Sequence, residues 1–101
     1  MKVRLTEKQI KDIKEAVKKV LGERAGIFIF GRRVDLTKKG GDIDILVLSD
    51  REMTEEKKFQ AKLDISVELY KRLGERKIDL IVTDRIEKEI EKTAVREGVE
   101  I

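Results

Sequence analysis

Apolar residues recur with helical spacing near the start of the chain. A segment from about Thr6 to Leu21 places them every three or four positions, at Ile10, Ile13, Val17, Val20 and Leu21. This spacing predicts an amphipathic helix whose apolar face covers a core. Thr6 and Gln9 have the spacing of a capping box, and Gly22 is a suitable stop for the helix.

The pattern then changes to short apolar runs. Ile27 to Phe30 lies between two glycines, and Ile43 to Leu48 is interrupted only by Asp44. Runs of this length predict buried strands. The eleven residues that follow Phe30 are too few for a crossover helix, so we expect the second strand to run antiparallel beside the first.

The second half of the chain predicts a helix, a strand and a further helix. A helix over about Thr54 to Leu73 would carry its large apolar side chains on or near one face, at Phe59, Leu63, Val67, Tyr70 and Leu73. Tyr70 is expected in the core with its hydroxyl at the surface. Lys77 to Thr83 reads as a third strand.

We expect Asp84 and Glu87 to start the last helix as a capping box. Ile86, Ile90 and Ala94 would form its apolar stripe, and Gly98 would end it before a short tail. Together these elements predict an α+β fold, a small mixed sheet covered by helices, in a single domain over residues 1–101.

Composition narrows the chemistry. The chain has no cysteine and no histidine, which excludes thiolate catalysis and the usual zinc ligands, so any metal would be bound by oxygen. No apolar run approaches the roughly 18 residues that a membrane helix needs, and no signal region is evident, so we expect a cytoplasmic location without a membrane partner. In 101 residues there is little room for a large substrate, so an enzyme of this size would need a partner chain.

Charged residues make up 45% of the chain, but 24 basic and 21 acidic side chains nearly cancel. An even mixture argues against a nucleic-acid partner, which favours a basic face. The abundance of Lys, Glu and Arg is typical of ion-pair-rich proteins from thermophiles.

Three aspartates carry the candidate chemistry. Asp42 and Asp44 are two residues apart at the start of a strand, so their carboxylates should point the same way, about 7 Å apart. Asp79 is the sole ionisable residue of its strand after Lys77, and on a neighbouring strand it would lie about 5 Å from them. Converging carboxylates repel one another unless a cation such as Mg²⁺ joins them, and a pair of such ions suits attack on a nucleotide phosphate.

The plainer interpretation treats the same residues as surface charges. Asp42 would be a turn residue, and Asp44 and Asp79 would pair with nearby Lys or Arg. The glycines at 40 and 41, directly before Asp42, favour the functional reading, because they would let a ligand approach the backbone.

At these residues the chain resembles the polymerase-β-like nucleotidyltransferase superfamily. Phe30-Gly31, a nine-residue gap from Arg33 to Gly41, and Asp42-Ile43-Asp44-Ile45 match its signature. The order of elements is also similar, and Asp79 falls where the family has its third carboxylate. The small size resembles the minimal nucleotidyltransferases, antitoxins encoded with a helical HEPN-type toxin.

The resemblance implies transfer of AMP from ATP, with two Mg²⁺ ions, to a tyrosine of that HEPN-type partner. Asp42 and Asp44 would bind the metals, and Asp79 would join one ion and act as general base. Gly31 would let the triphosphate approach the backbone, and Arg33 would contact phosphate.

Arg32 departs from the family pattern, because it stands where the family has Ser or Gly. Its guanidinium could bind phosphate or fill the site. Two alternatives therefore stay open: a weak or inactive nucleotidyltransferase-like antitoxin that acts by binding, and a Toprim-like Mg²⁺ domain. The Toprim fold expects a Glu after its first strand, where this chain has Gly31-Arg32.

Overall fold

The computed structural model describes residues 5–31 and 43–101. Seven elements follow one another in these ranges: α1 (Glu7–Leu21), β1 (Gly26–Phe30), β2 (Ile43–Leu48), α2 (Glu55–Leu73), β3 (Ile78–Thr83), α3 (Glu89–Glu97) and β4 (Val99–Glu100). Within the described ranges, no helix combines the length and the apolar character needed to cross a bilayer.

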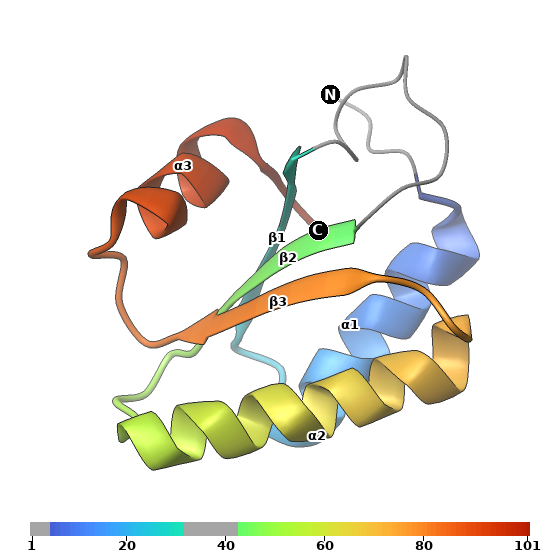
Figure 1. The fold of residues 1–101 in the computed structure, drawn as a ribbon, viewed down its shortest axis with the longest axis horizontal. Coiled ribbons are helices and arrows are strands. Elements are labelled where there is room, and N and C mark those ends of the chain that lie inside the picture. The colour runs from blue at the N-terminus through green and yellow to red at the C-terminus, as the bar shows by residue number, and fades with distance from the viewer. Residues whose placement is uncertain (1–4, 32–42) are drawn as a thin grey trace.

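The strands form one mixed sheet in the order β3-β2-β1-β4 (Figure 1). β1 and β2 pair antiparallel, as their short connection predicted. β3 runs parallel to β2, because the α2 crossover between them returns the chain to the same end of the sheet. β1 and β2 are the two central strands of the sheet. The end of β1, at Phe30, and the start of β2, at Ile43, flank the stretch that contains the glycines at 40 and 41.

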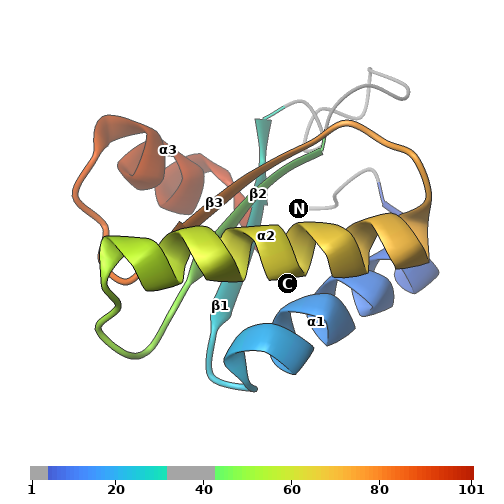
Figure 2. The same cartoon turned by 60° about the horizontal axis from the view of Figure 1, so that its bottom comes forward.

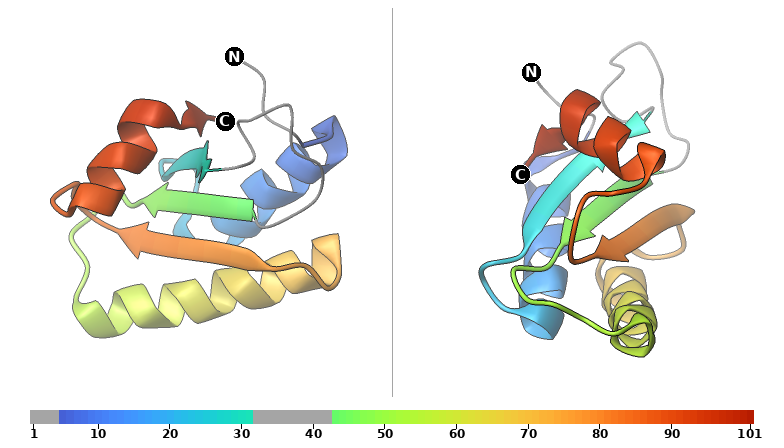
Figure 3. Two further views of the ribbon diagram at one scale, coloured as in Figure 1. Left: turned by 45° about the horizontal axis from the view of Figure 1, so that its top comes forward. Right: turned by 90° about the vertical axis from the view of Figure 1, so that its left-hand side faces the viewer.

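Helices cover both faces of this sheet. α2 and α3 lie on opposite sides of the strands, and α1 lies beside α2 (Figure 3). The larger core, on the side of α1 and α2, includes Ile13, Val17, Ile29, Ile45 and Ile65. A smaller core under α3 contains Phe30, Leu46 and Ala94. This arrangement confirms the α+β prediction.

α1 forms as its sequence indicates. Thr6 is the N-cap, its hydroxyl accepts from the Gln9 N–H at 3.1 Å, and the Gln9 side chain accepts from the Thr6 N–H at 2.9 Å. The capping box prediction is therefore confirmed, and the helix ends at Gly22. Reciprocal caps of this kind satisfy backbone donors that the first turn leaves unpaired.

α2 has the predicted length, but it turns a different face to the core. Its buried apolar residues are Ala61, Ile65 and Leu69, whereas Phe59, Leu63, Val67 and Tyr70 are exposed. The prediction of a core position for Tyr70 is wrong. The helix has two apolar stripes, and the one with smaller side chains packs on the sheet, where α1 and β3 leave limited space.

The last helix begins later than predicted. Lys88 is the N-cap of α3, and the buried Glu91 side chain accepts from the N–H groups of Glu87 and Lys88, both at 2.8 Å. Asp84 does not cap it, so the prediction of an Asp84–Glu87 capping box is wrong. Ile90 is also exposed, contrary to its place in the expected stripe.

The C-terminal tail is a strand. Val99 and Glu100 pair antiparallel with Ile29 and Phe28 of β1, and the Ile101 N–H donates to the Ile27 carbonyl at 3.0 Å. This fourth strand was not predicted, and it covers the edge that β1 would otherwise expose.

Candidate active site

Asp44 interrupts the apolar face pattern of β2. Its neighbours Ile43 and Ile45 are fully buried under α1 and α2, and because side chains alternate along a strand, Asp44 points to the opposite face. It lies there one position before Leu46, on the face that α3 covers. Asp44 is half-buried, so its carboxylate lies at the border between the smaller core and solvent.

The sheet register brings Asp79 beside Asp44. The two residues are direct partners on the parallel strands β2 and β3, and neighbouring strands lie about 4.8 Å apart. Partners in register point to the same face, so the two carboxylates are adjacent, with Asp79 exposed to solvent. The juxtaposition expected from the sequence is present for this pair.

Gly31 lies against Asp44 on the other side. Phe30, the last residue of β1, is the antiparallel partner of Asp44, so the next residue passes directly by the carboxylate. A Cβ on Gly31 would overlap the Asp44 carboxylate oxygen and lie 3.0 Å from its Cγ. Gly31 also has φ of +73°, a conformation that side chains disfavour. Two independent features therefore favour glycine at this position: the closeness of the Asp44 carboxylate and the positive φ.

This contact between Gly31 and Asp44 was missed at the level of the sequence. The signal that could have found it is the register: pairing Phe30 with Asp44 places residue 31 just beyond the ladder, next to the Asp44 side chain.

The remaining predicted site residues lie outside the described part of the chain. They are Asp42, Arg32 and Arg33. The expectation that Asp42 joins the same carboxylate cluster therefore stays a prediction.

Asp44 and Asp79 provide hard oxygen donors of the kind that Mg²⁺ accepts. Residues 5–31 and 43–101 contain no group of three or more His, Cys, Asp or Glu side chains arranged to hold a metal. Two adjacent carboxylates fit the way Mg²⁺ binds, since this ion commonly takes one or two protein carboxylates and completes its shell with water and phosphate.

Asp84, at the other end of β3, has a structural role. Its carboxylate accepts from the Met53 N–H at 2.7 Å and forms an ion pair with Lys58 at 3.1 Å. The Met53 hydrogen bond, followed by the Lys58 contact, holds the pKa of Asp84 below its ordinary value. These contacts join the start of α2 to the end of β3. Asp84 therefore stabilises the fold and is not part of the candidate site.

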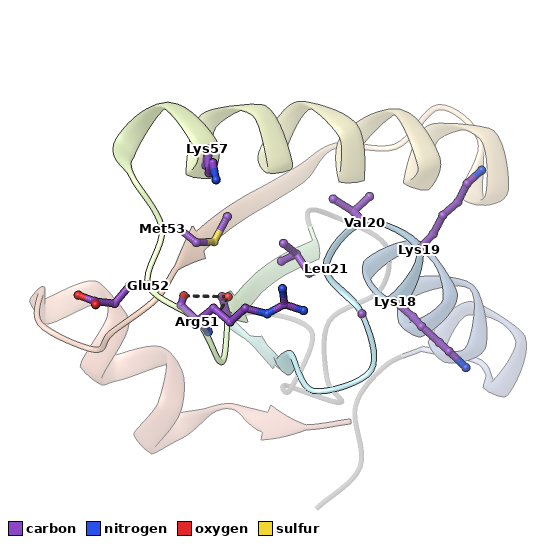
Figure 4. Close-up of a pocket in the computed structure, with 10 residues that line it drawn as sticks. Lys18, Lys19, Val20, Leu21, Arg51, Glu52, Met53 and Lys57 are labelled. Carbon is purple, nitrogen blue, oxygen red and sulfur yellow. Dashed lines mark hydrogen bonds between the residues drawn. The ribbon is translucent and has the colours of Figure 1, made fainter.

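A pocket of about 400 Å³ lies away from the aspartates, beside the carboxyl end of β2 (Figure 4). Ser49 lines it, five residues after Asp44 and therefore about 16 Å farther along the strand. In Figure 4 Lys18 and Lys19 extend away from the other lining side chains, and they form ion pairs with Glu23 and Glu68. We therefore place the candidate chemistry at Asp44 and Asp79.

Comparison with protein families assigns the chain to a class. The model of the family described as polymerase beta, nucleotidyltransferase, matches residues 8–101. The chain belongs to this family, and its sheet and helices are consistent with the nucleotidyltransferase fold. A search of curated proteins found no match. Membership excludes the Toprim-like alternative and supports nucleotidyl transfer as the general activity.

Proposed function

We propose that this chain is a Mg²⁺-dependent nucleotidyltransferase that moves AMP from ATP to a hydroxyl acceptor. The observation that carries the proposal is the register pairing of Asp44 with Asp79 in a chain of this family. Two carboxylates side by side at a solvent-facing edge offer oxygen ligands to a divalent cation. Mg²⁺ commonly takes one or two such carboxylates and completes its shell with water and phosphate oxygens.

The residues take distinct roles in this proposal. Asp44, with Asp42 two residues earlier, holds the metal ions, of which we expect two. Mg²⁺ at this position would neutralise charge on the phosphates as it develops. Asp79 is the more exposed carboxylate, so it is the one that an incoming acceptor reaches, and it takes the proton of the attacking hydroxyl.

The reaction is an in-line displacement at the α-phosphorus. The acceptor oxygen forms a bond to that phosphorus, the bond to the bridging oxygen breaks, and pyrophosphate leaves. Gly31 is exposed to solvent beside Asp44, which leaves its backbone accessible to the triphosphate. Arg33 supplies a phosphate contact.

We propose a tyrosine of a HEPN-type toxin as the acceptor, which makes the chain an antitoxin. The family match occupies residues 8–101, so little of this sequence is left to form a separate acceptor-binding domain. An acceptor carried by a partner protein is consistent with that size.

Calorimetric titration of Mg²⁺-ATP tests the metal site. Asp44→Asn should abolish Mg²⁺-dependent ATP binding, because the amide lacks the negative charge that the cation binds. Asp64→Asn is the matched control, since Asp64 is an exposed aspartate on α2. Unchanged affinity in Asp44→Asn would refute the assignment of Asp44 to the metal.

Arg32 favours a second candidate, an antitoxin that acts by binding alone. Incubation with α-phosphate-labelled ATP, Mg²⁺ and the HEPN-type partner separates the two functions, because only a transferase labels the partner. If Arg32 obstructs the site, Arg32→Ser raises labelling. Lower labelling would identify Arg32 as a phosphate ligand. If neither the unmodified chain nor the Arg32→Ser variant labels the partner, the result would support the binding role.

A further inference from the structure

The outer face of α2 carries a continuous apolar stripe. Phe59, Leu63, Val67 and Tyr70 are 62%, 45%, 52% and 62% exposed. Their spacing of four, four and three residues puts them on one side of the helix. Figure 2 shows α2 along the outside of the fold, with α1 beside it. We call these four residues the α2 stripe.

The α2 stripe is not needed to hold α2 in place. Ala61, Ile65 and Leu69 already bury the opposite side of the helix against the sheet. Single exposed apolar residues are ordinary, but a contiguous patch with two aromatic rings is typical of an interaction surface. The other exposed large apolar residues of the described chain, Ile90 and Val95, lie on α3.

Residues of opposite charge flank the two ends of the α2 stripe. Glu56, three residues before Phe59, is in the first turn of α2, which also carries Lys57 and Lys58, and Lys71, four residues after Val67, is in the last turn. Two such helices side by side in parallel would place Glu56 against Glu56 and Lys71 against Lys71. Antiparallel pairing instead places Glu56 of each copy near Lys71 of the other.

We propose that the α2 stripe binds a second copy of this chain, with the two α2 helices antiparallel about a twofold axis. The stripe is close to self-complementary: with Phe59 against Tyr70 of the second copy, Leu63 and Val67 lie near the axis. In the same register Glu56 comes within one turn of Lys71 of the second copy. Each contact then occurs twice, as a twofold interface requires.

The available area is sufficient for a reversible dimer. A buried aromatic side chain contributes about 150–250 Å², so at their exposure Phe59 and Tyr70 offer about 100–150 Å² each. With the two aliphatic residues, the pair of stripes would bury about 700 Å² of apolar surface. As apolar atoms make up about 60% of an interface, the whole would be about 1,200 Å², the lower end of stable complexes.

This dimer leaves both candidate active sites open. α2 packs on the face of the sheet that contains Ile45, whereas Asp44 and Asp79 lie on the opposite face. The proposal therefore stands independently of the nucleotidyltransferase activity, and a failure of one leaves the other intact.

Sedimentation velocity over a dilution series tests the dimer. We expect the chain to be dimeric at about 100 µM and to dissociate towards about 1 µM, as interfaces near the small end of the size range do. Leu63→Glu should raise the dissociation constant at least about a hundredfold, because two carboxylates would meet near the axis. Ile90→Glu, at a site on α3 that is 54% exposed, should have no effect, and circular dichroism checks that both variants fold.

Disulfide trapping tests the register, since the chain has no cysteine of its own. A mixture of Phe59→Cys and Tyr70→Cys chains should form a cross-linked heterodimer on oxidation. Phe59→Cys alone should not, because antiparallel pairing separates the two positions by about 16 Å along the axis. A monomer at all concentrations, equal weakening by Ile90→Glu, or efficient cross-linking of Phe59→Cys with itself would overturn the proposal.

Discussion

Gly31→Ala gives the most direct measure of how closely Asp44 is held. The new methyl group has two costs. Alanine at a positive φ costs about 1–2 kcal/mol, and its Cβ would overlap the Asp44 carboxylate. The Asp44 side chain can rotate away, so we expect the second cost to equal about one lost hydrogen bond of a charged group, roughly 1.5–3 kcal/mol.

Gly74→Ala isolates the backbone cost. Gly74 has φ of +79°, close to the +73° of Gly31, and a Cβ there would meet nothing within 4 Å. Guanidinium unfolding followed by far-ultraviolet circular dichroism would give the free energy of unfolding for each variant. We expect Gly31→Ala to lose about 1.5–3 kcal/mol more than Gly74→Ala.

A double-mutant cycle assigns that difference to Asp44. Asp44→Ala removes the overlapping oxygen and Cγ and leaves only a Cβ at 3.4 Å, an ordinary contact. In that background Gly31→Ala should cost no more than Gly74→Ala. If Gly31→Ala lowers the free energy of unfolding equally with and without the Asp44 carboxylate, the close approach of these two residues does not affect stability. That result would refute the reasoning.

Two further changes probe α3. Gly98→Ala should destabilise by about 3 kcal/mol in the same unfolding assay, since its Cβ would lie 2.8 Å from the Ile29 carbonyl oxygen and backbone cannot rotate away. A loss below about 1 kcal/mol, the low end for overpacking, would contradict this. Burial opposes ionisation of Glu91, but hydrogen bonds from Glu87, Lys88 and Thr83 outweigh it and lower its pKa below 4.5. The charged cap therefore stabilises the fold fully above pH 4.5, and this stabilisation is lost as the pH falls through the lowered pKa of Glu91. Glu91→Gln should make stability less dependent on pH below 4.5, whereas the exposed Glu89→Gln should not; equal slopes for the two variants would refute this.

The antiparallel pairing of β1 with β2 could be predicted because it rests on a local chain length, whereas the Asp44–Asp79 pair was expected only if β3 neighboured β2. A short connection after Phe30 requires an antiparallel neighbour, and a helix of the length of α2 permits a parallel return. Alternation along β2 then fixes which face Asp44 occupies. These rules do not depend on how the helices pack against the sheet.

The orientation of α2 could not be predicted in the same way. Both of its sides carry apolar residues at helical spacing, and periodicity alone favours the larger ones, such as Phe59 and Leu63. The side that packs is decided by the space beneath the sheet, where Ala61 and Ile65 fit.

Two other differences have equally non-local causes. Asp84 looks like an N-cap, but it accepts from Met53, 31 residues earlier in the chain, so the α3 cap falls to Lys88 and Glu91. β4 is two residues long, too short to show a period, and it forms because the edge of β1 needs a partner.

The distance in sequence between Asp44 and Asp79 has a thermodynamic consequence. Their adjacency depends on the parallel β2–β3 ladder, which closes only once α2 has crossed the sheet. A cation held by both carboxylates would therefore bind the complete fold and not the isolated β1–β2 hairpin. At a hundred times its dissociation constant such a ligand would add about 2.7 kcal/mol to global stability, so the melting temperature of the whole chain would report occupancy of one pair of side chains.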